Sequence, residues 1–153
     1  MKVITETTGN FSIGSDQKYI SGYADIGVRW LQGSGLSLGI SGLVGRAPYE
    51  SVPIGVRFRV GHKAGSGRLE HSLSLYRPSS VGATGILIGG TYYPADWIGL
   101  LAQVDSAPTP ASSFTRKTIF SLGLRLGEKP GKWAMIAAST VVMLAALAEG
   151  LYQ

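Results

Sequence analysis

Short runs in which apolar and polar residues alternate occupy the first 127 residues of the chain. The clearest run is Ile54–Val60, in which every second residue is apolar and Arg57 and Arg59 lie between them. A second run, Phe120–Leu126, alternates Phe and Leu with Ser, Gly and Arg. Successive side chains of a strand point to opposite faces, so this alternation predicts strands with one apolar and one polar face.

Eight such runs follow one another, and Gly-, Pro- and Ser-rich connectors separate them. Their residue ranges are 2–13, 20–31, 35–44, 52–62, 68–77, 84–92, 97–105 and 117–127. No helical period is visible before residue 130. The pattern therefore predicts a mainly β fold of about eight antiparallel strands, closed into a barrel or folded into a sandwich so that few sheet edges stay exposed.

The pattern changes after the breaker at residues 128–132, which we take as a linker between two parts of the chain. Trp133–Ala148 contains sixteen residues without a charge, and the segment reaches twenty residues at Tyr152. At 1.5 Å per residue, twenty helical residues cover about 30 Å, the thickness of the hydrocarbon layer. We expect a β domain over residues 1–127 and a transmembrane helix over 133–152.

Charge and aromatic residues predict how this helix is placed. All 14 Lys and Arg precede it, and Lys129 and Lys132 stand immediately before it. With Trp133 and Tyr152, these lysines are the expected interfacial anchors, and the positive-inside rule puts the N-terminal domain in the cytoplasm. The N-terminal residues lack the apolar core of a secretory signal, which favours the same orientation. The net charge of +5 suits anionic lipid headgroups better than nucleic acid, because the basic residues are scattered singly.

The composition of the helix indicates protein neighbours. Ala134, Ala138, Ser139 and Ala145 are small and allow close packing against other helices. Glu149 is expected at the interface or against a cation of a partner. The segment contains no His, so it offers no imidazole to a haem or chlorophyll, and its predicted role is packing.

Candidate chemistry is sparse, and no catalytic residue, metal ligand or cofactor is predicted. The chain has no Cys, which excludes disulfides and thiolate metal sites. His62 and His71 can face each other across a hairpin, but Glu70 is the only acid nearby, and a metal site needs three or four ligands. Asp96 and Asp105 stand singly near predicted turns. We therefore expect a protein that is not an enzyme.

Several strands resemble those of small eight-stranded outer-membrane β-barrels of Gram-negative bacteria. Thr91–Leu100 looks like a strand–turn–strand unit of that family, and Phe120–Leu126 is similar to its closing strand. The resemblance covers most of residues 20–127 and implies apolar faces that point outward into lipid. The chain departs from the family where it continues into an apolar segment after the last strand.

Three functions follow from these observations. The favoured one is a non-catalytic accessory subunit of a larger integral-membrane complex of the inner membrane, such as a photosynthetic or respiratory assembly. Its β domain would cover the membrane surface with apolar faces inward and Arg57 and Arg59 outside, while its helix packs among those of partner subunits. The alternative is an outer-membrane barrel acting as a pore, adhesin or membrane-integrity protein. A lipocalin-like ligand carrier is the third.

Overall fold

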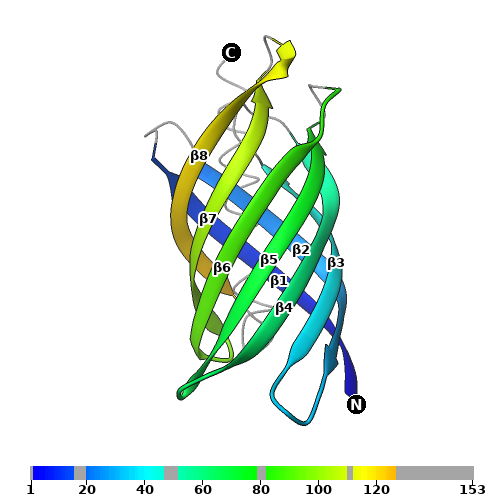
Figure 1. Ribbon diagram of the computed structural model, residues 1–153, viewed down its shortest axis with the longest axis vertical. Coiled ribbons are helices and arrows are strands. Elements are labelled where there is room, and N and C mark those ends of the chain that lie inside the picture. Colours follow the sequence, from blue (N-terminus) through cyan, green and yellow to red (C-terminus); the bar gives the residue numbers. More distant parts are fainter. Residues whose placement is uncertain (1, 16–19, 47–51, 79–81, 110–111, 127–153) are drawn as a thin grey trace, which may run out of the picture.

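The computed structural model describes residues 2–15, 20–46, 52–78, 82–109 and 112–126. Each strand pairs antiparallel with the next, and the last pairs with the first, so the sheet is a closed barrel (Figure 1). The predicted eight antiparallel strands are confirmed, in the barrel form rather than the sandwich. The strands are β1 (Lys2–Gly14), β2 (Ile20–Leu31), β3 (Ser37–Arg46), β4 (Pro53–Ala64), β5 (Gly67–Pro78), β6 (Gly85–Ala95), β7 (Ile98–Thr109) and β8 (Ser112–Leu126).

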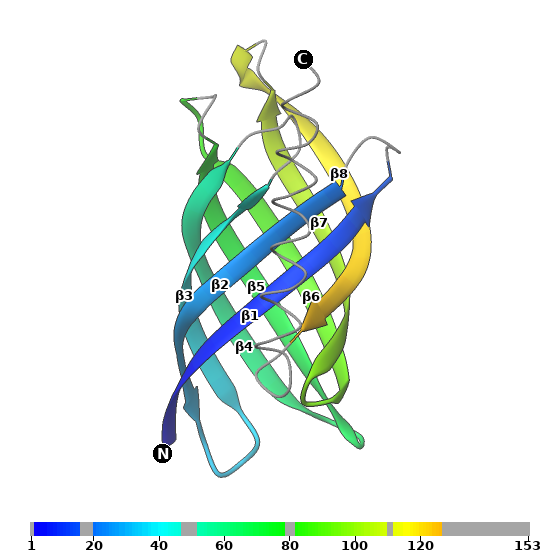
Figure 2. The same ribbon diagram turned by 180° about the vertical axis from the view of Figure 1, so that it is seen from behind.

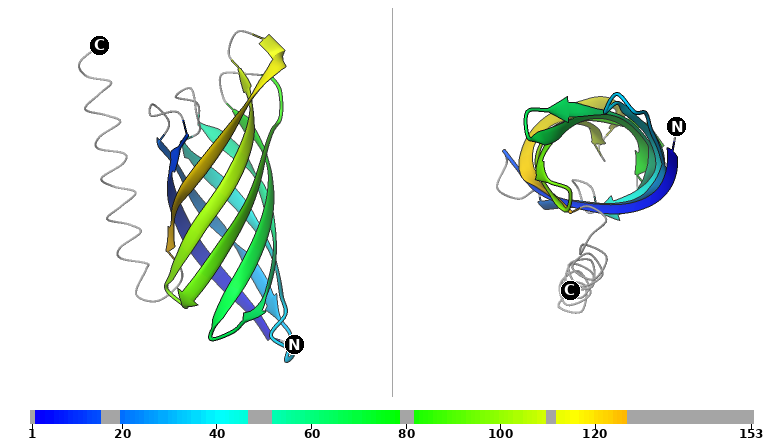
Figure 3. Two further views of the ribbon diagram at one scale, coloured as in Figure 1. Left: turned by 60° about the vertical axis from the view of Figure 1, so that its left-hand side comes forward. Right: turned by 90° about the horizontal axis from the view of Figure 1, so that it is seen from below.

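The strands are strongly staggered around the barrel. A path of paired residues that leaves β1 at Lys2 passes through every strand and returns to β1 at Ser12, ten residues further along. For eight strands this stagger corresponds to a tilt of about 40° from the barrel axis. Figure 2 shows β1 and β2 crossing the barrel obliquely, and the view from below in Figure 3 shows one closed ring.

The two ends of the barrel differ. One end, which we call the turn end, holds the connections β2–β3, β4–β5 and β6–β7 (bottom of Figure 1). The start of β1 and the last residue of β8 lie at the same end. Gly65 has a φ of 59°, which a two-residue hairpin loop between antiparallel strands requires. The opposite end, the loop end, holds the connections β1–β2, β3–β4, β5–β6 and β7–β8.

The barrel is apolar outside and polar inside. Arg57 and Arg59 on β4 are only 1% and 2% exposed and point inward, whereas Ile54 on the same strand is 67% exposed. The favoured prediction of inward apolar faces was therefore wrong. Alternation fixes which residues share a face and leaves open which face is enclosed. The polar faces of different strands carry opposite charges that pair inside the barrel, and this pairing allows the interior to be charged.

The apolar part of the interior is small and lies toward the loop end. Tyr23, Leu43, Tyr76 and Leu87 form one buried cluster there. They come from β2, β3, β5 and β6 and reach across the barrel. Most of the remaining buried side chains are polar or charged.

The predicted linker and transmembrane helix, residues 128–152, lie outside the described residues. The same holds for the sites predicted there: Lys129, Lys132, Trp133, Ala134, Ala138, Ser139, Ala145, Glu149 and Tyr152. Within the part of the chain that the structure describes, no helix is long and apolar enough to cross a membrane.

Candidate functional site

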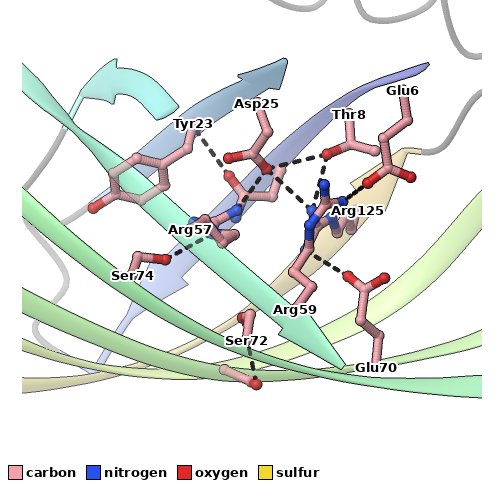
Figure 4. Close-up of polar contacts among 12 residues, drawn as sticks. Glu6, Thr8, Tyr23, Asp25, Arg57, Arg59, Glu70, Ser72, Ser74 and Arg125 are labelled. Atoms are coloured by element: carbon pink, nitrogen blue, oxygen red, sulfur yellow. Dashed lines mark hydrogen bonds and ion pairs between the residues drawn. The ribbon is translucent and has the colours of Figure 1, made fainter. Parts of the chain in front are cut away.

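The interior ion pairs are organised around one carboxylate, Asp25 on β2 (Figure 4). Its Oδ2 atom accepts a hydrogen bond from Arg57 Nη1 at 2.6 Å and from Arg125 Nη2 at 3.1 Å. The hydroxyl of Thr8 donates to the same oxygen at 3.1 Å. A single buried carboxylate therefore joins β1, β2, β4 and β8.

Two further acids extend the chain of charges. Glu70 on β5 pairs with Arg29 at 2.7 Å and with Arg125 at 3.0 Å. Glu6 on β1 pairs with Arg29 at 2.8 Å and with Arg59. One unbroken series results, which we call the interior network: Arg59, Glu6, Arg29, Glu70, Arg125, Asp25 and Arg57.

Positive and negative side chains alternate along the network, which crosses the interior from wall to wall. Its members come from β1, β2, β4, β5 and β8, and each is at most 4% exposed. A lone charge buried to this degree costs several kcal/mol of desolvation, so each arginine needs the carboxylates beside it. Further bonds hold the guanidinium groups in place: Arg57 Nε donates to Ser74 Oγ at 2.7 Å, and Arg125 Nη2 donates to Thr8 Oγ1 at 2.9 Å.

A second polar cluster occupies the interior near the loop end. The Asp105 carboxylate accepts hydrogen bonds from the Tyr76 hydroxyl at 2.7 Å and from the Tyr23 hydroxyl at 3.5 Å. The guanidinium of Arg57 lies 5.7 Å from the centre of the Tyr23 ring, which connects this cluster to the interior network. Asp105, expected as an isolated residue near a turn, is instead buried inside the barrel.

The turn end of the interior carries an arginine stacked on a tyrosine. Arg68 on β5 lies 4.3 Å from the centre of the buried Tyr93 ring on β6. Polar and aromatic side chains thus cross the interior at both ends and at mid-height. The arrangement is that of a filled barrel, in which the side chains of the chain itself occupy the lumen.

The outer wall forms an apolar belt. Exposed apolar positions run from Val52, immediately before β4, to Val60 on β4, and eight residue steps at a tilt of about 40° give a height of about 20 Å. Exposed apolar side chains continue around the barrel: Phe11, Ile13, Ile26, Leu38, Ile40, Val44, Leu73, Leu75, Ile88, Leu100, Phe120, Leu122 and Leu124.

Aromatic and basic residues border the belt. Tyr92 and Trp97 are exposed near the turn end. Arg77 and Arg116 are exposed near the loop end, where Arg116 also donates hydrogen bonds to the Thr84 and Ser106 carbonyl oxygens. Apolar walls edged by aromatic side chains are typical of membrane barrels.

The histidines lie on the outer wall, away from the interior network. His62 and His71 face each other across the β4–β5 hairpin as expected, with ring centres 5.9 Å apart and stacked. Among the described residues, no group of three or more His, Cys, Asp or Glu side chains could hold a metal ion.

Sequence reasoning missed the interior network because its members are far apart in the chain. Arg125 and Asp25, for example, are 100 residues apart. The signal that could have revealed the network is the polar face of each strand. Glu6 on β1 and Asp25 on β2 lie on the same face of their strands as Ser, Thr and Tyr residues. Acids on some strands and arginines on others indicate a charged interior.

No protein-family model matches the chain, and neither the search of curated proteins nor that of solved structures finds a match. The class is therefore set by the structure: a closed, eight-stranded antiparallel β-barrel with a charged interior and an apolar outer wall.

Proposed function

We propose that this chain is a membrane-spanning β-barrel of the outer-membrane type, and that it acts as a structural, membrane-integrity protein rather than as an open pore. The observation that carries the proposal is the reversed polarity of the barrel, with ion pairs inside and an apolar belt outside. This agrees with the resemblance found in the strands Thr91–Leu100 and Phe120–Leu126.

The outer wall is far more apolar than that of a water-soluble barrel. Ile26 and Leu122 are each 71% exposed, and among the described residues exposed apolar side chains surround the barrel with no charged strand face between them. Soluble monomers rarely expose contiguous apolar patches above a few hundred Å². Lipid removes this cost, and barrel closure supplies the backbone partners that strands need where water is absent.

The interior favours a structural role over diffusion. The interior network joins five of the eight strands through paired charges, and Tyr23 and Tyr76 meet Asp105 near the loop end. Opening a passage would require several of these pairs to separate inside a narrow barrel. Eight-stranded barrels are commonly filled by their own side chains.

The accessory-subunit function predicted from residues 133–152 places the β domain on the membrane surface. The apolar belt supports a barrel that is itself immersed, so we rank this function second. A lipocalin-like carrier ranks third, because ion pairs occupy the space that its ligand would need.

The test begins with reconstitution of the purified chain into lipid vesicles. We expect the unheated protein to migrate differently from the boiled protein on a gel, and to float with the vesicles. We also expect a trapped dye of a few hundred daltons to be retained. Protein that stays in the aqueous fraction without heat-modifiable mobility would refute the membrane barrel, and dye release would refute the closed interior.

Lipid exposure can be measured directly because the chain has no cysteine. A fluorophore on Phe58→Cys, from the outer wall, is expected to be quenched strongly by lipids that carry a quencher in their acyl chains. The matched control is Asp96→Cys in the β6–β7 turn, which should be quenched weakly. Equal quenching at the two positions contradicts the proposal.

A further inference from the structure

The apolar belt contains a hollow on β6 and β7. Gly90 on β6 and Ala102 on β7 are directly paired and both face outward, so two small residues lie side by side. Larger side chains surround them and leave a hollow of about 600 Å³. The outward side chains at its border are Ile13, His71, Ile88, Val104, Phe120 and Leu122.

The hollow is open space and not a consequence of backbone crowding. A Cβ atom added at Gly90 would meet no atom within 4 Å. By contrast, a Cβ at Gly123 would overlap the backbone at Phe11. Packing inside the barrel therefore does not require a glycine at position 90, and a larger side chain there would fill the hollow from the lipid side.

We propose that the apolar segment 133–148 of the same chain crosses the membrane against this hollow, packed on the outer wall of β6, β7 and β8. The inference rests on the proposed function, because it needs the outer wall to lie in lipid. It adds an intramolecular partner for a surface that the barrel itself leaves uncovered.

The position of the segment in the chain supports this occupant. The last strand, β8, borders the hollow through Phe120 and Leu122 and ends at Leu126 at the turn end. Residues 127–132 then separate it from Trp133, and six residues can span up to about 20 Å. The segment can therefore enter the membrane beside the strand that it follows.

Length and composition also match. Sixteen residues of helix measure about 24 Å, close to the height of about 20 Å estimated for the apolar belt. Ala134, Ala138 and Ala145 fall on one face of a helix, because they are separated by four and seven residues. In lipid, small residues on both surfaces allow the close approach on which packing depends, and here Gly90 and Ala102 would face these alanines.

The absence of cysteine from the chain makes disulfide cross-linking a clean test. In vesicles, Ala102→Cys is paired with a cysteine at each position from 134 to 148 in turn. We expect intramolecular disulfides that recur every three or four residues along the segment. The control is Gly42→Cys on β3, across the barrel from β7, for which we expect less than a tenth of the cross-linking.

A filling variant tests the hollow itself. Gly90→Leu is expected to lower cross-linking from Ala102→Cys at least fivefold. Gly42→Leu is the matched control, because Gly42 is also exposed and an added Cβ would lie 3.9 Å from its nearest neighbour, the Ile26 carbonyl oxygen. It should leave the cross-linking unchanged.

Three results would overturn the proposal: equal cross-linking to β3 and β7, disulfides only between two chains, or no effect of Gly90→Leu. Disulfides between chains would assign the hollow to a second copy instead. Vesicle flotation and heat-modifiable mobility are measured on the same samples. A barrel that inserts without the expected cross-links refutes this inference alone, whereas failure to insert refutes the proposed function.

Discussion

Asp25→Asn tests whether the interior network holds the barrel together. The substitution keeps the size of the side chain and one oxygen acceptor but removes the negative charge. Arg57 and Arg125 then lose the carboxylate that lies 2.6 Å and 3.1 Å from their Nη atoms. Arg125 keeps Glu70, whereas the remaining partners of Arg57 are the neutral Ser74 hydroxyl and the Tyr23 ring.

The partners that Arg57 and Arg125 keep determine the expected loss of stability. Breaking a buried ion pair by removing one partner costs about 3–5 kcal/mol, because the other charge stays buried. The new amide keeps one oxygen acceptor, and Arg125 keeps Glu70 as a carboxylate partner. We therefore expect Asp25→Asn to cost about 3 kcal/mol, near the lower limit of this range. Asp96→Asn, in an exposed turn, should change the free energy of unfolding by less than about 0.5 kcal/mol.

Equilibrium urea unfolding in vesicles, followed by gel mobility, measures both variants. A double-mutant cycle with Arg57→Met isolates the interaction between Asp25 and Arg57. Because the double variant leaves neither of these two charges without its partner, its loss of stability should be smaller than the sum of the two single losses by at least about 1.5 kcal/mol. A loss below about 1 kcal/mol for Asp25→Asn, or additive single effects, would refute the reasoning.

Three further substitutions probe other parts of the barrel. Tyr76→Phe removes the 2.7 Å hydrogen bond to Asp105 and should lower the free energy of unfolding by about 1–3 kcal/mol in the same urea assay, with little effect of Tyr92→Phe on the outer wall. Phe58→Lys should destabilise a lipid-embedded barrel by about 2–4 kcal/mol near mid-height, whereas no loss in vesicles would contradict immersion. Gly123→Ala should abolish heat-modifiable mobility because its Cβ would overlap the Phe11 carbonyl oxygen at the β1–β8 closure, and Gly90→Ala should preserve it.

The strands could be predicted from the sequence because the alternation is a local property. The run 52–62 corresponds to β4 at Pro53–Ala64, and the run 20–31 to β2 at Ile20–Leu31. The largest errors in the bounds lie at the β7–β8 connection, where the predicted runs stop at 105 and resume at 117, whereas β7 ends at Thr109 and β8 begins at Ser112. Pro108 falls between the predicted runs 97–105 and 117–127, yet β7 continues through it to Thr109, with an irregularity in the pairing to β8 at that point. A proline lacks the N–H of a ladder bond and fits where the pairing is irregular.

The direction of the polar faces could not be read from any single strand. Ile54–Val60 shows the same alternation whether Arg57 and Arg59 point to water or into the barrel. The deciding information is the match between strands: acids on β1, β2 and β5 meet arginines on β2, β4 and β8. That match depends on closure and stagger, which no local pattern contains.

Closure and the interior network also depend on each other. Arg125 on the last strand reaches Thr8 on β1, Asp25 on β2 and Glu70 on β5. If β8 paired with β1 one residue out of register, every side chain of β8 would change face. Arg125 would then point into lipid and leave Asp25 and Glu70 short of positive charge in a buried site, while Leu124 would enter the polar interior. The buried charges therefore oppose every register of the closing strand that places Arg125 outside, and this selectivity explains how a charged interior specifies one closed barrel.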